Sequence, residues 1–449
     1  MNPSSRLRLV LLAAALPLSV SRAQISDSAL GAVAGIPVNY TEAKTGAYTL
    51  PDPLTFADGS PVADARAWRE KRRPELLELV EENEYGRVPP RPPALAFDVF
   101  DQGTPALDGK ALRKQVTIYF TASRTAHYVD LLVYLPARAT GPAPVLLNFG
   151  WTANNLAVPN DPGVKVGRTW NNQQRARVPA VPVAPADAAA KKGGPGRNLG
   201  ATILQILARG YGFAIFNYND IDPDALNATA HGIRAAYLKP GATEPAPDEW
   251  GAIAAWGWGA SRMIDYFETD STIDAKRIAI TGASRLGKTV LWAAARDERI
   301  AGVIASVSGE GGAALSRRDY GETIAHLVAP TRYPYQFAGN YQKWADKTKE
   351  MPWDAHTIIA LVAPRPILLQ TGSTDKWSDP YGEFLAARAA TPVFALLGKK
   401  GIEQFSQPAL GRPLMNTLGY LMHDGPHGVL PADRPVFLDF LDAHLKPAN

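Results

Sequence analysis

The chain of 449 residues contains no cysteine. This absence excludes disulfide bonds, a cysteine nucleophile and any metal site built from thiolates, so the core alone must stabilise the fold. The chain also lacks the long Lys/Arg runs that mark nucleic-acid-binding proteins, and its net formal charge is only +4. We therefore expect a protein that does not bind nucleic acid.

Long hydrophobic runs are missing as well. A transmembrane helix needs about 20 apolar residues, and residues 9–20 form a shorter apolar stretch. This stretch follows Arg6 and Arg8 and precedes the small-residue pattern Ser-Arg-Ala at 21–23. These features predict a signal peptide over residues 1–23, and hence an exported protein, periplasmic or secreted, that no membrane anchor holds.

Hydrophobic residues make up 46% of the chain, enough to bury a large core. Helical segments at 199–208, 250–267, 288–296 and 382–390, and a final amphipathic helix, separate short apolar β-rich runs. This alternation predicts an α/β protein with a mostly parallel sheet and helices on both faces, and the antiparallel-looking pair at its start favours the α/β-hydrolase fold. The predicted strands are 116–120, 129–135, 145–149, 213–218, 277–281, 302–307, 366–370 and an eighth near 418–422.

The remaining segments predict the domain organisation. Residues 24–95 are Pro-rich and should wrap around the outside of a catalytic domain at 96–449, with one helix over 67–82 that Pro74 could break. Two insertions interrupt the catalytic domain, one at 153–197 rich in Pro and Gly and one at 314–357 rich in Arg, Tyr and Trp. Insertions that follow strands usually form the rim of an active site.

The most informative motif is Gly-Ala-Ser-Arg-Leu-Gly-Lys-Thr at 282–289, between an apolar β-branched strand and a helix. A serine on such a turn is the nucleophile elbow of a hydrolase, where the helix N-terminus and the next amide stabilise an oxyanion. The usual pattern is G-x-S-x-G. Here Leu286 occupies the place of the second glycine, which follows as Gly287.

The same letters fit the phosphate loop G-x-x-x-x-G-K-[ST] of nucleotide hydrolases. Three observations oppose that interpretation. An exported chain meets little nucleotide, the motif follows about four strands rather than the first, and the next strand runs into Ser308-Gly309 with no acidic residue for magnesium. We therefore favour Ser284 as a nucleophile.

A serine hydrolase also needs an acid and a histidine, in that chain order for this fold. Asp375 follows the strand at 366–370 after a glycine turn, and His427 lies in a Gly/Pro-flanked loop near the end. His427 would act as general base toward Ser284, with Asp375 orienting it. Asp379 is an alternative acid, and His423 an alternative histidine whose position at a strand end suggests a structural hydrogen bond.

The segment 282–288 resembles the G-x-S-R-x-G-K signature of glucuronoyl esterases, carbohydrate esterase family 15. The likeness extends over most of the chain after about residue 60. Supporting segments are Asn-Tyr-Asn-Asp-Ile-Asp-Pro at 217–223, Leu-Ser-Arg-Arg-Asp-Tyr-Gly-Glu at 315–322, Asp-Lys-Trp at 375–377 and Gly-Pro-His at 425–427. The resemblance implies an enzyme that cleaves the ester between 4-O-methyl-glucuronic acid of xylan and lignin alcohols.

The resemblance also implies roles for other residues. Arg285 would stabilise the oxyanion with a fixed positive charge, which fits the chemistry of the step. Lys288 would reach sugar hydroxyls, Glu322 would accept hydrogen bonds from them, and Trp377 would pack beside the sugar ring. Each of these four residues could instead be structural, as buried aromatics and ion-paired carboxylates often are.

The chain departs from the family pattern at two positions. Fungal members have a disulfide-bonded cysteine where Ala283 stands, so the chain resembles bacterial members. Many members place the catalytic acid on a glutamate about 23 residues after the serine, where this chain has Val307. The acid must come from elsewhere, which favours Asp375, with Glu310 as a further alternative.

Together these observations predict a serine esterase that works as a monomer through an acyl-enzyme, with no metal or organic cofactor. Its partner is the glucuronoxylan–lignin ester, with no nucleic acid and no membrane. Alternatives are another carbohydrate or acetyl esterase on the same fold, a nucleotide hydrolase, and a carbohydrate-binding relative without activity, which the surviving serine, acid and histidine disfavour.

Overall fold

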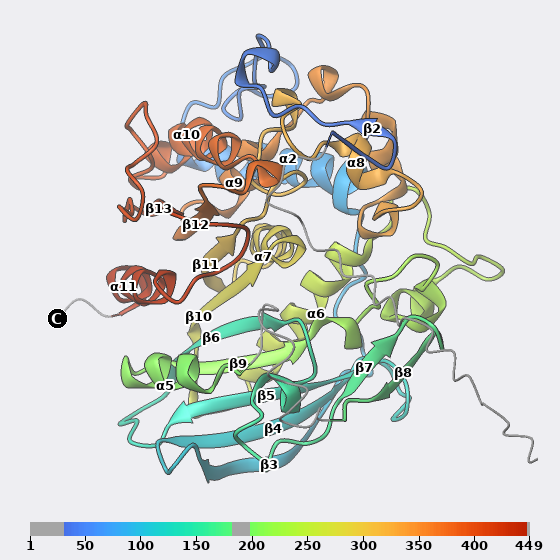
Figure 1. The fold of residues 1–449 in the computed structure, drawn as a ribbon, viewed down its shortest axis with the longest axis vertical. Helices are drawn as coiled ribbons and strands as arrows, with labels where there is room; N and C mark the ends of the chain where they lie inside the picture. Colours follow the sequence, from blue (N-terminus) through green and yellow to red (C-terminus); the bar gives the residue numbers. More distant parts are fainter. Residues whose placement is uncertain (1–30, 182–197, 447–449) are drawn as a thin grey trace, which may run out of the picture.

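The computed structural model describes residues 31–181 and 198–446 (Figure 1). The predicted signal peptide and residues 182–197 of the first predicted insertion lie outside this range. A nine-stranded sheet forms the centre of the molecule, in the spatial order β13-β12-β11-β10-β6-β9-β5-β4-β3. Its strands are β3 (Ala96–Ala106), β4 (Ala111–Tyr119), β5 (Tyr128–Pro136), β6 (Ala143–Gly150), β9 (Gly212–Asn217), β10 (Ile273–Ala283), β11 (Ile300–Ser306), β12 (Ile367–Gly372) and β13 (Leu418–His423).

The sheet has an antiparallel and a parallel part. β3, β4, β5 and β9 pair antiparallel, whereas β9, β6, β10, β11, β12 and β13 are all parallel. The eight predicted strands and the mostly parallel sheet are thus confirmed. The ninth strand, β3, was missed because it is an edge strand with mostly exposed or half-buried residues, and it lacks the apolar run that buried strands have.

Helices cover both faces of the sheet, as predicted. α5 (Gly200–Ala208) and α11 (Asp433–Leu445) lie on one face. α6 (Ala252–Phe267), α7 (Arg285–Arg296), α9 (Ala355–Val362) and α10 (Pro380–Leu396) lie on the other (Figure 1). α9 had not been predicted, because it begins within the stretch 314–357, where no helical periodicity is visible. In the part of the chain that the structure describes, no helix has the length and apolar character needed to cross a membrane.

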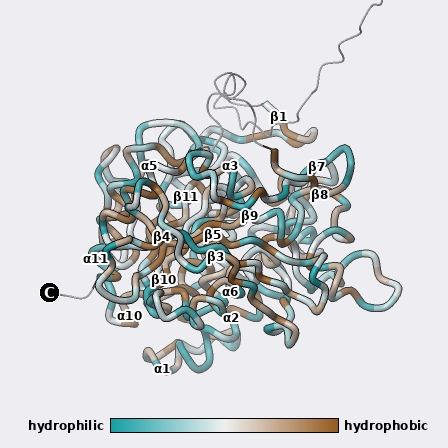
Figure 2. The backbone as a smooth tube through the Cα atoms, turned by 90° about the horizontal axis from the view of Figure 1, so that it is seen from below, coloured by the Kyte–Doolittle hydropathy of each residue, from teal (hydrophilic) through white to brown (hydrophobic). Residues whose placement is uncertain are grey.

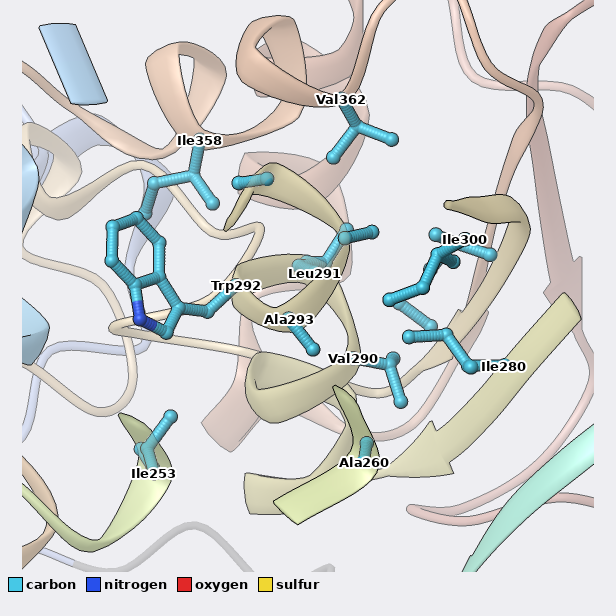
Figure 3. Packing of buried hydrophobic residues seen from close by; sticks show 14 of the residues in the cluster. Ile253, Ala260, Ile280, Val290, Leu291, Trp292, Ala293, Ile300, Ile358 and Val362 are labelled. Atoms are coloured by element: carbon cyan, nitrogen blue, oxygen red, sulfur yellow. The ribbon is translucent and has the colours of Figure 1, made fainter. Parts of the chain in front are cut away.

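The face that carries α6, α7 and α9 is packed densely. Trp292, Leu291 and Val290 of α7 lie between Ile253 of α6, Ile358 of α9 and strand β10 (Figure 3). These side chains are almost fully excluded from water. The central strands consist largely of buried apolar residues, and the backbone is coloured brown for hydrophobic residues around β5 and β9 in Figure 2. This packing supplies the rigid base that a strained turn at the strand ends requires.

Residues before the sheet pack against the same face. The chain is helical without interruption over residues 65–85, which include α1 (Ala65–Ala67), α2 (Arg73–Val80) and two π-helical turns. Pro74 therefore does not break the predicted helix. It stands in the first turn of α2 after a π turn, where a missing amide hydrogen costs little. Arg73 donates to carbonyls of Ala295 in α7 and Leu361 in α9, which joins this helix to the helical layer on that face of the sheet.

The two predicted insertions also contain short elements. Residues 168–179 form a hairpin of β7 (Arg168–Asn171) and β8 (Ala176–Pro179). Arg177 of this hairpin donates to the carbonyls of Asn219 and Asp220, in the segment that follows β9. Residues 314–357 contain α8 (Ile324–Val328), several 3-10 turns and the first residues of α9.

Candidate active site

Ser284 lies on a sharp turn between β10 and α7, with φ of 58° and ψ of −129°. Non-glycine residues rarely adopt a positive φ, and the conformation is characteristic of a nucleophile elbow. The turn is held by a hydrogen bond from the Ser284 amide to the carbonyl of Ser306 at 2.9 Å. α7 begins at the next residue, so the amides of its first turn, which have no intrahelical acceptor, lie beside the serine.

Two glycines make room for this turn. A Cβ at Gly282 would lie 2.4 Å from the Leu286 carbonyl oxygen, and a Cβ at Gly287 would lie 2.7 Å from that of Ser306. The second glycine is therefore needed at 287, where α7 touches β11. Leu286 is fully buried and packs in the core instead. This explains why the motif departs from G-x-S-x-G.

The same contacts contradict the phosphate-loop interpretation. The groups that such a loop directs at a phosphate are engaged within the protein here. The Lys288 ammonium donates to the Ser308 carbonyl at 2.5 Å, its amide donates to the Ser284 carbonyl, and the Thr289 hydroxyl donates to the Arg285 carbonyl at 2.8 Å. A phosphate loop would instead direct its lysine ammonium and threonine hydroxyl at the nucleotide and its magnesium.

His427 and Asp375 come from the loops after β13 and β12, and the structure brings them together. The His427 Nδ1 atom lies 2.6 Å from Asp375 Oδ2. The Asp375 carboxylate is buried, whereas 18% of the His427 side chain is exposed. Because Asp375 has no proton to give when it is ionised, Nδ1 is the donor in this pair. The neutral imidazole then presents Nε2 as a base.

The alternatives that the sequence left open are engaged elsewhere. Asp379 accepts from Arg318 Nε at 2.7 Å and from the Gly382 amide at 2.9 Å. Glu310 accepts from the Ser316 hydroxyl at 2.6 Å, and burial raises its pKa well above the ordinary value. Neither carboxyl contacts His427, since Asp375 and the Ser378 hydroxyl are the partners of Nδ1. Asp375 is thus the acidic residue at the histidine.

His423 has the structural position that its place at a strand end suggested. Its Nδ1 lies 2.8 Å from Asp433 Oδ2 in α11, and its Nε2 lies 2.9 Å from the Pro426 carbonyl. Burial alone would lower the pKa of His423, but these two acceptors raise it overall. With both ring nitrogens occupied, His423 anchors the loop that carries His427.

Arg285 follows the serine and forms a half-buried ion pair with Asp224, at 2.5 Å. Burial alone would lower the pKa of Arg285, yet the Asp224 carboxylate raises it well above the ordinary value. The guanidinium carbon also lies 4.6 Å from the centre of the Tyr333 ring. Arg285 is therefore charged at every working pH and held in one direction.

Asp224 accepts four side-chain hydrogen bonds. Arg285 and the Tyr218 hydroxyl donate to Oδ2, while the Tyr335 hydroxyl (2.7 Å) and the Gln336 amide (2.8 Å) donate to Oδ1. Burial raises the pKa of Asp224, but Arg285 and these donors lower it overall. Sequence reasoning missed Asp224, although it follows the segment 217–223 directly. Its partners Tyr335 and Gln336 come from the predicted insertion at 314–357.

The three residues with implied sugar contacts are buried or nearly so. Lys288 points into the protein toward the Ser308 carbonyl, and burial lowers its pKa. Glu322 pairs with Arg332 at 2.6 Å, and the Arg332 guanidinium lies 5.2 Å from the centre of the Trp377 ring. The Glu322 amide also donates to the Trp377 carbonyl at 2.8 Å, so these two residues are neighbours.

Glu383 of α10 is a buried carboxyl that holds the loop after β11, at residues 308–309. It accepts from the Gly309 amide at 2.6 Å and the Ser308 hydroxyl at 3.2 Å. Burial raises the pKa of Glu383 to about 8. This carboxyl is therefore neutral at pH 7, and sequence reasoning gave no signal for it. In the range that the structure covers, no three His, Asp or Glu side chains are arranged to hold a metal ion.

Comparisons with known proteins identify relatives of this chain. Residues 244–398 match a family model described as glucuronyl esterase of fungi. Over 407 residues the chain is 41% identical to a carbohydrate esterase from an unknown prokaryotic organism, covering 91% of this chain and 92% of that protein. It is 29% identical over 387 residues to the 4-O-methyl-glucuronoyl methylesterase of Cerrena unicolor, covering 84% of this chain and 67% of that one.

Two solved structures have the same fold. A glucuronoyl esterase from Solibacter usitatus superposes with a TM-score of 0.83 at 44% identity, over 90% of this chain and all of that one. A promiscuous esterase of carbohydrate esterase family 15 from a marine bacterial metagenome gives a TM-score of 0.80 at 40% identity, over 91% of this chain and all of that one. The predicted α/β-hydrolase fold is confirmed by these likenesses.

Proposed function

The chain belongs to the glucuronoyl esterases of carbohydrate esterase family 15, which are carboxylic ester hydrolases, and we propose that Ser284, His427 and Asp375 form its catalytic triad. The substrate in this proposal is the ester that joins 4-O-methyl-glucuronic acid of glucuronoxylan to lignin alcohols. The observation that carries the triad is the hydrogen bond between His427 and Asp375 at the sheet edge where Ser284 stands on its elbow. The Cerrena unicolor relative is a 4-O-methyl-glucuronoyl methylesterase, which supports the acid component of this substrate.

The reaction begins when Ser284 Oγ attacks the ester carbonyl carbon and His427 Nε2 takes the hydroxyl proton. Asp375 keeps the imidazole in the tautomer with the proton on Nδ1, and stabilises the imidazolium that forms. The tetrahedral oxyanion is stabilised by the charge of Arg285 and by amides at the start of α7. This charge does not titrate away, because Asp224 keeps Arg285 protonated.

The intermediate then collapses. The carbon–oxygen bond to the alcohol breaks as His427 gives its proton to the departing oxygen, which leaves the glucuronoyl group on Ser284. Water attacks this acyl-enzyme, and His427 takes a proton from the water. The tetrahedral species expels Ser284 Oγ, which regains its proton, and glucuronic acid is released. Every group in this cycle belongs to the chain or the substrate, so the proposal needs no metal or organic cofactor.

The sugar is held by Lys288, Glu322 and Trp377 in this proposal. Lys288 and Glu322 are buried polar side chains. The Lys288 ammonium can donate hydrogen bonds to sugar hydroxyls and the Glu322 carboxylate can accept them, while the Trp377 ring packs beside the sugar. We also propose that the enzyme is exported as a monomer, on the strength of the N-terminal sequence pattern and the location of plant cell walls outside cells.

A second candidate function is hydrolysis of simple acetyl or aryl esters, because the marine relative is described as promiscuous. Both candidates are tested by measuring hydrolysis of benzyl glucuronate and of an aryl acetate by the parent chain and by Ser284→Ala. We expect a strong preference for the glucuronate and its loss in the variant. A preference for acetate would favour the second candidate, and an active variant would rule out Ser284 as the nucleophile.

A further inference from the structure

A cavity of about 160 Å³ lies between α5, α11 and the sheet, next to the elbow. Its floor is formed by the last residues of β6 and β10 and by Phe213 and Ile215 within β9, and its walls by side chains of the two helices. Figure 1 shows α5 and α11 on the same side of the sheet, opposite α6 and α7. The cavity therefore occupies the less densely covered face.

The cavity reaches residues close to the nucleophile and the base in sequence, although neither Ser284 nor His427 lines it. Ala283, directly before Ser284, and Val429, two residues after His427, both line it. Along β10, side chains alternate between faces, so Ala283 and Thr281 point away from α7 and toward the cavity. Of the three residues assigned above to the sugar, Lys288, Glu322 and Trp377, none lines it.

This position is where the alcohol half of an ester must go. The departing oxygen takes its proton from His427, so the alcohol lies on the histidine side of Ser284. The sugar side is occupied by Lys288, Glu322 and Trp377 on other elements. The two halves of the ester then extend in different directions from Ser284, one toward Lys288 and one into the cavity.

The lining of the cavity combines apolar walls with unpaired polar groups. Most of it is aliphatic or aromatic, from residues such as Phe149, Ile206 and Phe437. Asn148 of β6 and Thr281 of β10 are neighbours in register and point into it. Both side chains are half-buried and expose polar atoms to the cavity.

These polar groups have no partner within the protein. Among residues 31–181 and 198–446, neither the Asn148 amide nor the Thr281 hydroxyl has a side-chain hydrogen bond, and the Arg434 guanidinium at the cavity wall has none either. The buried hydroxyl of Thr202, on the α5 wall, is also unpaired. The site thus presents donors and acceptors around an apolar space, which is the usual composition of a small-molecule pocket.

The size of the cavity matches one substituted aromatic ring. An apolar cavity of about 150 Å³ is large enough to hold benzene. We propose that this cavity binds the aryl group of the alcohol half of the ester, with Asn148, Thr281 and Arg434 contacting oxygen substituents on the ring. This inference rests on the proposed function and specifies its leaving group: an aryl-alkyl alcohol with hydroxyl or ether oxygens.

Filling the cavity tests the assignment. Thr202→Phe places a ring in the space from α5, and Ala208→Phe adds the same ring to an exposed position on the same helix that does not line the cavity. We expect Thr202→Phe to lower the ratio of kcat/KM for benzyl over methyl glucuronate about tenfold, since the pocket contacts of one ring are lost. Ala208→Phe should leave this ratio unchanged. An unchanged ratio in a folded Thr202→Phe variant would overturn the proposal.

A binding measurement separates this inference from the proposed function. Benzyl alcohol is titrated into Ser284→Ala and into the double variant Ser284→Ala/Thr202→Phe, and its binding is measured by ligand-observed NMR. We expect binding only to the first protein, and binding that persists when glucuronate is present, because the halves occupy different places. Benzyl alcohol that is displaced by glucuronate, or that binds both proteins equally, would refute the cavity assignment. If neither glucuronate ester is hydrolysed by the parent, the proposed function fails, and the benzyl alcohol titration still decides the cavity.

Discussion

Two carboxylates flank the serine elbow, and each accepts a hydrogen bond from a basic side chain, yet their surroundings differ. Asp375 holds His427 through a single short bond, and its other oxygen, Oδ1, has no partner in the described part of the chain. Asp224 holds Arg285 and has both oxygens filled by two tyrosines and a glutamine as well. The two pairs are similarly exposed, at 18% for His427 and 16% for Arg285, so they differ in the number of hydrogen bonds to the carboxylate and not in access to water.

The difference fits the role that each pair has in the proposed mechanism. A base must gain and lose a proton in every turnover, so its partner stabilises the imidazolium without fixing it permanently. A group that stabilises an oxyanion must keep its charge and direction, so its partner is saturated and does not titrate. The same residue type therefore supplies a proton-transfer partner on one side of Ser284 and a rigid counter-ion on the other.

The largest expected effect comes from removing the charge of the first carboxylate. Asp375→Asn should lower kcat by about 10⁴-fold, because an amide can donate to Nδ1 and favour the wrong histidine tautomer. The measurement is steady-state hydrolysis of benzyl glucuronate. Asp379→Asn is the matched control: it should lower the free energy of unfolding by weakening the pair with Arg318, yet keep kcat within a few fold. The reverse ranking of kcat would assign the acid to Asp379.

Removing the charge of the second carboxylate should have a smaller effect. Asp224→Asn should lower kcat by about 10²-fold with little change in KM, because Arg285 loses its fixed position and not its charge. A double-mutant cycle with Arg285→Ala distinguishes positioning from general structure. If Asp224 acts through Arg285, the double variant should be no slower than Arg285→Ala alone. Additive losses would contradict this role. Tyr335→Phe removes one of the four donors to Asp224, and it should lower kcat far less than Asp224→Asn does.

The smallest expected effect concerns Glu383, which lies beneath the first pair and is neutral at pH 7. Its pKa is about 8 in the folded chain and near 4.5 when unfolded. Between these values the folded state binds more protons, so the contribution of Glu383 to stability is complete below about pH 4.5 and is lost as pH rises to 8. Because of this group, the free energy of unfolding falls by at most about 1.4 kcal/mol for each pH unit.

Glu383→Gln tests this dependence, because the amide resembles the neutral carboxyl and can still accept from Gly309. Urea unfolding from pH 5 to 8 should show that the variant gains stability relative to the parent as pH rises. A constant difference across this range would mean that Glu383 is ionised in the folded protein. Glu84, whose pKa burial also raises to about 8, remains in both proteins and cancels in the comparison.

The elements and residues that sequence reasoning found share one property: their signal is local. Eight strands were visible as apolar runs, and Ser284, Asp375 and His427 as motif residues after strand ends. β3 was missed because an edge strand has no continuous apolar run. Asp224 and Glu383 were missed because their partners are 61 and 74 residues away in sequence, and no local pattern marks a carboxylate that only the fold surrounds with donors.

The choice between the two candidate acids also depends on contacts between residues distant in sequence. Asp375 and Asp379 are four residues apart, so the sequence favoured Asp375 by its position after a strand and a glycine turn and by the family pattern, and left Asp379 open. The fold separates them sharply, because Arg318 reaches Asp379 from the segment after β11, while His427 reaches Asp375 from the segment after β13.

The order of the strands has a consequence for how activity arises during synthesis. Ser284 and Arg285 are translated well before His427, and the loop with His427 is anchored by Asp433 in the last helix. A chain emerging from the ribosome therefore carries a nucleophile with no base until β13 and α11 have docked on the sheet. Hydrolytic activity should appear abruptly with the completion of folding, which makes it a sensitive reporter of refolding of the final strand and helix.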